Sequence, residues 1–198
     1  PISEEALAPS LIRVDVGLYD PATGSQLQPQ SVVIGELKMV PKKRQTSSLA
    51  LSKVEGVKRE GFNLDNKVGL IRYNVNKTGF RPGEEIHLTL YWRAEAEMGT
   101  DYTVFTHLID EEGKIWGQMD SQPLQGDYPT SFWDIGEVIE DEYILPIQED
   151  APVRLYRLEV GMYDLATEQR LPVLGDDGEV KDDRVLLPPV ILVASVPH

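Results

Sequence analysis

Hydrophobic and polar residues alternate over several stretches of the chain, as they do in strands that bury one face against a core. The alternation is clearest in residues 86–94 and 155–163. The residues expected to point inward are Ile86, Leu88, Leu90 and Trp92 in the first stretch and Tyr156, Leu158, Val160 and Met162 in the second. No long stretch has the 3.6-residue period of an amphipathic helix, so strands are predicted throughout.

Three further stretches are also predicted to be strands. The inward residues are expected to be Gly69, Ile71, Tyr73 and Val75 in residues 68–76, and Ile139, Tyr143 and Leu145 in residues 138–146. Residues 102–110 are apolar at both faces, which is typical of a central strand. Between the strands, Pro82 and Gly83 predict a type II turn, and Gly113 predicts a tight hairpin loop at residues 110–114.

Short strands separated by Pro and Gly turns favour an all-β fold, an antiparallel β-sandwich. The even alternation argues against a parallel sheet, whose strands are apolar on both faces. We therefore expect an immunoglobulin-like or carbohydrate-binding-module-like sandwich, with a jelly-roll variant as the alternative.

One segment of the chain occurs twice. Residues 11–27 and 155–171 align without gaps and are identical at nine positions. These are Leu11, Arg13, Val16, Gly17, Tyr19, Asp20, Ala22, Thr23 and Leu27 in the first copy. A strand-like run follows each copy, at residues 32–40 and 185–193. The repeat thus predicts the same unit in both copies, an amphipathic strand, a turn and a second strand. Within the turn, the second copy has Glu168 where the first has Gly24.

The repeat divides the chain into three parts. The copies begin 144 residues apart, and residues 45–150 have no counterpart before the first copy. We therefore interpret residues 1–40 as the C-terminal strand hairpin of a preceding repeat unit, residues 41–59 as a polar linker, and residues 60–198 as a complete sandwich. Two strands without their sandwich are expected to pack on the full domain, to self-associate by exchange with a second molecule, or to stay disordered.

Charge and composition exclude several classes of protein. The net charge of −14 disfavours nucleic acid and anionic membranes as partners, and the short basic cluster at residues 42–44 is interpreted as a solvated linker. The chain has no cysteine, which excludes disulfides, thiolate zinc sites and cysteine nucleophiles. No apolar run approaches the length of a membrane span, so membrane insertion of these residues is not expected.

Catalytic and metal-binding motifs are not recognisable. The chain has three histidines, His87, His107 and His198, and they are interpreted as structural or terminal. We expect no enzyme activity, although a His107 that approached a carboxylate inside a cleft would favour one. The acidic groups at residues 110–112, 176–177 and 182–183 are interpreted as solvated loop acids rather than calcium ligands, so no metal or cofactor is predicted.

The segment 117–137 is long for a loop and rich in aromatic and polar residues, the combination that suits a glycan. The candidate ligand-binding residues are Trp116, Gln125, Asp127, Tyr128, Phe132, Trp133 and Asp134. The alternative, which we prefer, is that Phe132 and Trp133 fold under the loop and cap one end of the sandwich.

Residues 81–94, 101–146 and 156–171 together resemble a β-sandwich module of large bacterial proteins, many of them membrane-anchored and glycosyltransferase-like, with repeated soluble domains. The resemblance covers about residues 60–193 and carries over no catalytic residue. It implies a non-catalytic accessory or interaction module of a larger protein, located outside the cytoplasm or at the cell surface. The alternative function is a carbohydrate-binding module that uses the loop around Trp133.

Overall fold

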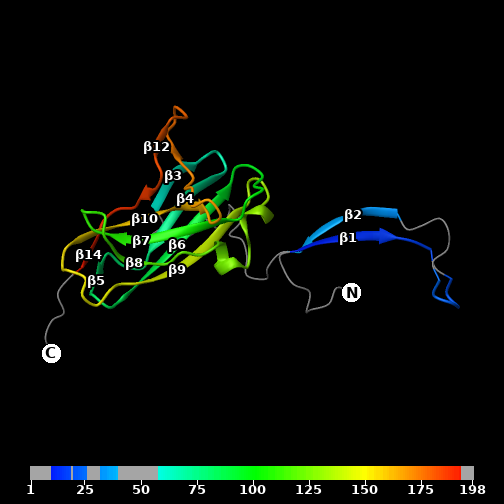
Figure 1. Ribbon diagram of the computed structural model, residues 1–198, viewed down its shortest axis with the longest axis horizontal. Coiled ribbons are helices and arrows are strands. Elements are labelled where there is room, and N and C mark those ends of the chain that lie inside the picture. The colour runs from blue at the N-terminus through cyan, green and yellow to red at the C-terminus, as the bar shows by residue number, and fades with distance from the viewer. Residues whose placement is uncertain (1–9, 19, 26–31, 40–57, 193–198) are drawn as a thin grey trace. The chain divides into compact units, whose positions relative to one another are not determined.

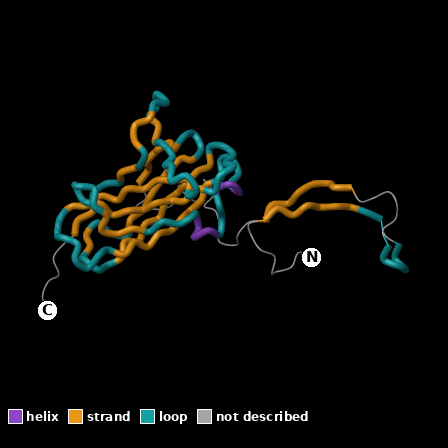
Figure 2. Tube along the Cα trace, viewed as in Figure 1, coloured by secondary structure: helices purple, strands orange, loops and turns teal. Residues whose placement is uncertain are grey.

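The computed structural model describes residues 10–18, 20–25, 32–39 and 58–192, and it is all-β, as expected (Figures 1 and 2). The chain divides into two compact units, Pro1–Lys42 and Lys43–His198, which are described separately. The basic cluster at residues 42–44, most of the expected linker and His198 lie outside the described residues.

The larger unit is a sandwich of two sheets. The strands of the first sheet, in spatial order, are β12 (Val180–Asp182), β11 (Val173–Leu174), β3 (Lys58–Leu64), β4 (Val68–Val75), β6 (Glu85–Ala94) and β9 (Val138–Pro146). Those of the second are β5 (Gly79–Phe80), β14 (Val190–Leu192), β10 (Leu155–Asp164), β7 (Tyr102–Ile109) and β8 (Ile115–Gln118), with β13 (Val185–Leu186) also paired to β10. All these pairs are antiparallel except β14 with β5, so the predicted antiparallel sandwich is confirmed.

The core lies between the two sheets and contains the residues that alternation predicts. All eight residues expected to point inward from β6 and β10 are at most 1% exposed. Strand β7 is buried along its whole length and lies between β10 and β8, which confirms the prediction of a central strand. The Gly83 turn is also confirmed, since the Glu84 amide donates to the Arg81 carbonyl and Gly83 has a φ of 82°.

The predicted inward face of β4 is wrong in its first half. A β-bulge between Leu70 and Arg72 adds one residue to the strand and reverses the alternation at that point. Val68 and Leu70 therefore enter the core before the bulge, and Tyr73 enters it after the bulge. Gly69 and Ile71 lie instead along the hollow on the outer face that is described below.

In its described residues, the smaller unit contains one antiparallel hairpin, formed by β1 (Ser10–Val16) and β2 (Val32–Met39). Its register matches that of the second copy pair by pair. Val16 lies opposite Val32 as the aligned Val160 lies opposite Val185. At the other end, Leu11 is opposite Lys38, and the aligned Leu155 is opposite Ile191.

Both hairpins also contain the same irregularity. In the smaller unit the register shifts by one residue, because Val14 pairs with Gly35 whereas Asp15 pairs with Val33. In the larger unit Leu187, which aligns with the skipped residue, donates its amide to the carbonyl of Leu158. Residues 188–189 are both proline and lack the N–H groups of a ladder. The two prolines therefore interrupt this segment and divide it into β13 and β14, whereas the corresponding segment of the first copy is the continuous strand β2.

The turns of the two copies share their hydrogen bonds. The Asp20 and Asp164 carboxylates each accept the amide two residues later, at 2.8 and 2.9 Å. Their carbonyls accept the amides of Gly24 and Glu168 at the same distance, 2.8 Å. Glu168 has a φ of 59°, close to the 68° of Gly24, so the two copies form the same turn. This positive φ is strained for a glutamate but not for a glycine. A left-handed conformation costs a residue with a β-carbon about 1 kcal/mol.

Candidate functional site

The loop between β8 and β9 folds its aromatic residues against the protein. It contains the 3-10 helices η1 (Pro123–Gly126) and η2 (Thr130–Phe132). The indole N–H of Trp133 donates to the Tyr128 carbonyl at 3.0 Å. The Tyr128 hydroxyl donates to the Glu137 carboxylate at 3.0 Å. Trp133 and Tyr128 are 3% and 1% exposed, so their ring faces are covered by protein and support the capping interpretation.

The structure does not bring all the loop candidates together. Gln125, Asp127 and Asp134 are exposed and Phe132 is half-buried. Trp116 lies near the far end of β7, where its indole N–H donates to the Asp110 carboxylate at 2.7 Å. The loop instead meets the start of β7, where the Thr130 hydroxyl accepts the amide of Tyr102 at 2.9 Å. Glycan binding by this loop therefore stays a prediction. The seven candidates do not form one surface on which an aromatic ring is open to a sugar.

A buried group of charged residues lies on the outer face of the second sheet. His107 of β7 and Glu159 of β10 are directly opposite in register, and both are buried. The His107 Nδ1 lies 2.8 Å from the Glu159 Oε1, and its Nε2 lies 3.1 Å from the Asp120 Oδ1. The other carboxylate oxygen of Glu159 accepts from Arg184 at 2.7 Å, and Arg170 lies 3.6 Å from Oε1. Each buried charge therefore has a partner of opposite sign.

These contacts shift the pKa values of the pair in opposite directions. Burial lowers the pKa of His107, but hydrogen bonds to Asp120 and Glu159 outweigh it and raise that pKa to about 9. Burial raises the pKa of Glu159, but hydrogen bonds from His107 and Arg184 outweigh it and lower that pKa to about 2. The two residues therefore form an ion pair at neutral pH.

His107 approaches two carboxylates and lines a cavity, which is the arrangement that would favour an enzyme. A general base, however, must be unprotonated near the working pH and must reach the proton that it removes. His107 is protonated at neutral pH, and both its ring nitrogens are engaged by carboxylates. Its geometry is that of a fixed cation that organises its neighbours.

The cavity beside His107 has a volume of about 270 Å³ and lies between β7, β10 and the turn after β10. Its lining residues are Phe105, His107, Asp120, Tyr163, Leu165, Glu168 and Arg170. The guanidinium of Arg170 lies 4.1 Å from the centre of the Phe105 ring. None of these residues was predicted as part of a site, and His107 was interpreted as a structural histidine. They come from distant parts of the chain, and the one available signal was the Glu168 substitution in the repeated turn.

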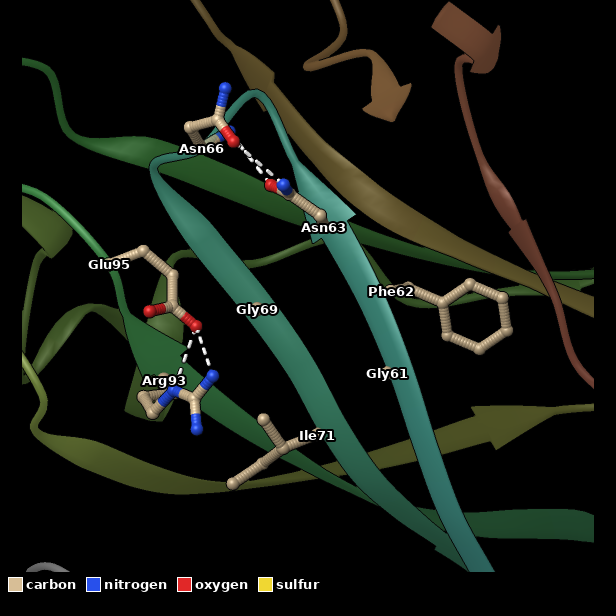
Figure 3. A pocket seen from close by; sticks show the side chains of 8 residues that line it. All are labelled: Gly61, Phe62, Asn63, Asn66, Gly69, Ile71, Arg93 and Glu95. Atoms are coloured by element: carbon tan, nitrogen blue, oxygen red, sulfur yellow. Dashed lines mark hydrogen bonds and ion pairs between the residues drawn. The ribbon is translucent and has the colours of Figure 1, made fainter. Parts of the chain in front are cut away.

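A second, larger hollow of about 500 Å³ lies on the outer face of the first sheet (Figure 3). Gly69 forms bare backbone at its centre, and a β-carbon there would come within 2.8 Å of the Glu95 carboxylate. The polar groups around it are already paired. Asn63 donates to Asn66 at 2.7 Å, and the Nε of Arg93 donates to Glu95 at 2.7 Å. Figure 3 also shows the ring of Phe62, another residue that lines the hollow, on the opposite side of β3 from Arg93 and Glu95.

Within the described residues, no group of three or more His, Asp or Glu side chains is arranged to hold a metal ion. In the same part of the chain, no helix is long and apolar enough to cross a membrane. No protein-family model and no curated protein sequence matches the chain.

Proposed function

We propose that the chain belongs to a tandem array of β-sandwich units and acts as a non-catalytic interaction module of a larger, extracytoplasmic protein. The observation that carries the proposal is the agreement of the two hairpins in register, bulge and turn. Identical long-range pairing is expected when two segments are built to close the same kind of sandwich.

A glycine shared by both copies supports this proposal. A β-carbon on Gly161 would lie 2.5 Å from the Phe105 ring, so the strand accommodates this ring only because position 161 is glycine. The first copy has Gly17 at the same place. Glycine is unfavourable in a strand unless close packing requires it. We infer that β1 is also built to pair with a strand like β7 that carries an aromatic residue opposite Gly17.

The proposal predicts that the strands of the two copies are interchangeable. Residues 155–164 would be replaced by the sequence of residues 11–20 within the full chain, which changes only Tyr156→Ile, Leu158→Val, Glu159→Asp and Met162→Leu. We expect this chimera to unfold cooperatively and to keep its near-ultraviolet circular dichroism. A matched control inserts the same ten residues one position later, which turns the apolar face outward and should abolish folding. A chimera that behaves like this control would contradict the proposal.

Self-association through the hairpin is part of the same proposal. Val16 aligns with the buried Val160 but is itself 54% exposed. A lysine there would place a charge on the face that exchange would bury against a second molecule. Light scattering of the concentrated full chain should show association that Val16→Lys removes and that Ser25→Lys, a control in the exposed turn, keeps. A strict monomer at high concentration would contradict exchange between chains.

Glycan binding is the second candidate function. The buried rings of the 117–137 loop do not support it, but the cavity beside His107 does, because charged side chains and the half-buried ring of Tyr163 line it.

A further inference from the structure

We propose that the cavity lined by Tyr163, Glu168 and Arg170 binds one uncharged sugar residue of a glycan. This inference rests on the second candidate function and gives it a location, on the outer face of the β10–β7–β8 sheet. It assigns the site to residues other than those of the Trp133 loop.

The internal repeat separates residues that build the turn from residues that line the cavity. Ala166 and Thr167 are identical in the first copy, and both take part in the hydrogen bonds of the turn. Between residues 165 and 170 the copies differ at four positions, and three of them, Leu165, Glu168 and Arg170, line the cavity. The first copy has proline, glycine and glutamine at these places. The second copy has therefore kept the scaffold and changed the side chains that face the cavity.

Glu168 is the most informative of these changes. Its φ of 59° suits the glycine of the first copy, and a glutamate is strained there. Within the described residues, its carboxylate has no hydrogen-bond or ion-pair partner that would compensate for this strain. Residues in strained conformations are concentrated at functional sites. We infer that the carboxylate of Glu168 is retained for a ligand.

The other polar groups of the cavity are held in place before any ligand arrives. The guanidinium of Arg170 lies over Phe105 and is 3.6 Å from both Glu159 and Asp183. The carboxylate of Asp120 is held by the His107 ring at 3.1 Å. Groups fixed in this way bind without losing side-chain entropy, which favours affinity.

The balance of charge selects an uncharged ligand. The cavity presents the cations His107 and Arg170 and the carboxylates Asp120 and Glu168. A cationic ligand would be repelled by the first two groups and an anionic ligand by the other two. Sugar hydroxyls donate to carboxylates and accept from a guanidinium, so a neutral sugar satisfies both kinds of group. The apolar surface of Tyr163 and the exposed Leu165 offers contact to the C–H face of the ring.

The size of the cavity sets the length of the ligand. A volume of about 270 Å³ lies near the lower limit for small-molecule sites and suits a single sugar ring. The hollow in Figure 3 is larger, but its amides and its charged groups are paired with each other, whereas the Glu168 carboxylate of the smaller cavity has no hydrogen-bond or ion-pair partner among the described residues. We therefore assign the sugar to the cavity beside His107.

The test measures binding of the full chain to neutral methyl glycosides of common hexoses and N-acetylhexosamines and to their oligosaccharides, by glycan array and then by calorimetry. Lysine amide and glucuronate serve as charged probes. The main variants are Glu168→Gly and Leu165→Pro, which copy the first repeat and keep its turn. Asn66→Gly is the matched control, because it removes an amide from the hollow in Figure 3 at a residue whose φ of 53° also tolerates glycine.

We expect the wild type to bind a neutral sugar, Glu168→Gly to weaken binding at least tenfold while raising the melting temperature, and Asn66→Gly to leave binding unchanged. If sugar binding survived both main variants, or were lost in Asn66→Gly, the location of the site beside His107 would be contradicted, although the chain would still be a glycan-binding protein. Binding of a charged probe in place of the neutral sugars would also overturn the inference. If the wild type bound no sugar, glycan binding itself would be contradicted. The tandem-module proposal would be unaffected, because the chimera of residues 155–164 tests it separately.

Discussion

His107 and Glu159 lie opposite each other on adjacent central strands and form an ion pair 2.8 Å long that is almost completely buried. Polar residues are common on the outer face of a sandwich sheet, but there they are normally exposed to solvent, whereas this pair is buried. Here the pair is closed by Asp120 on the histidine side and by Arg184 and Arg170 on the glutamate side. The outer face of the second sheet is therefore held by charge as well as by packing, and its stability depends on pH.

The first prediction concerns this dependence at alkaline pH. The pKa of His107 is about 9 in the folded chain and 6.5 by default, so its stabilising contribution is complete below pH 6.5 and is lost as the pH rises through 9. We expect the free energy of unfolding to fall by about 1–3 kcal/mol between pH 6.5 and 9.5. Urea unfolding at both pH values measures it. His107→Gln should lack most of this decline, and an equal decline in that variant would contradict the assignment.

A second prediction concerns the contact between Gly161 and Phe105. Gly161→Ala places a β-carbon 2.5 Å from the ring, so the ring or the strand must move. We expect a loss of about 1–3 kcal/mol in the free energy of unfolding. Gly99→Ala is the control, because apart from Gly99 and its two chain neighbours no residue has a heavy atom within 4 Å of the position of its β-carbon. Adding Phe105→Leu to Gly161→Ala should recover part of the loss, and no recovery would show that the cost arises elsewhere.

The third prediction tests whether the 117–137 loop caps the sandwich. Trp133 is buried and its indole N–H is bonded within the loop, so Trp133→Ala should cost about 3–5 kcal/mol of stability by chemical unfolding. Ile135→Ala, at an exposed residue of the same loop, should change stability by less than about 0.5 kcal/mol. A Trp133→Ala variant as stable as the wild type would argue against capping.

The fourth prediction concerns a buried acid in β9. Asp141 is 1% exposed and accepts the Leu124 amide at 3.0 Å and the Tyr143 hydroxyl at 2.5 Å. Burial raises its pKa to about 6, against the opposing effect of these hydrogen bonds. Because the folded pKa lies above the unfolded value of 3.8, this residue makes the chain less stable as the pH rises from about 4 to 6.

Asp141→Asn cannot ionise, so the variant should lack this contribution, a difference of about 1–3 kcal/mol between pH 4 and 7 relative to the wild type. Urea unfolding of both proteins at the two pH values measures the difference. Parallel pH profiles for the two proteins would show that Asp141 does not titrate in this range.

The sequence alone determined the layers of the sandwich. Alternation placed Leu88, Leu90 and Leu158 in the core, because a strand presents every second residue to the same face whatever its neighbours are. The repeat revealed a unit that recurs, and Asp164 and Thr167 hold its turn through bonds to atoms a few residues away. These features depend on local geometry, which a sequence pattern records directly.

Only the tertiary structure decided which side chains meet. The bulge in β4 reversed the face of Gly69, since one extra residue changes the phase of a strand without changing its composition. His107, Glu159 and Arg170 form one charged group because β7 and β10 are neighbours in the sheet and the chain after β10 returns over them. Trp133 is covered because its loop folds onto the segment before β7, where the Thr130 hydroxyl donates to the Thr100 carbonyl. Burial and partnership depend on strand order and long-range contact, and a period of two residues contains no information about either.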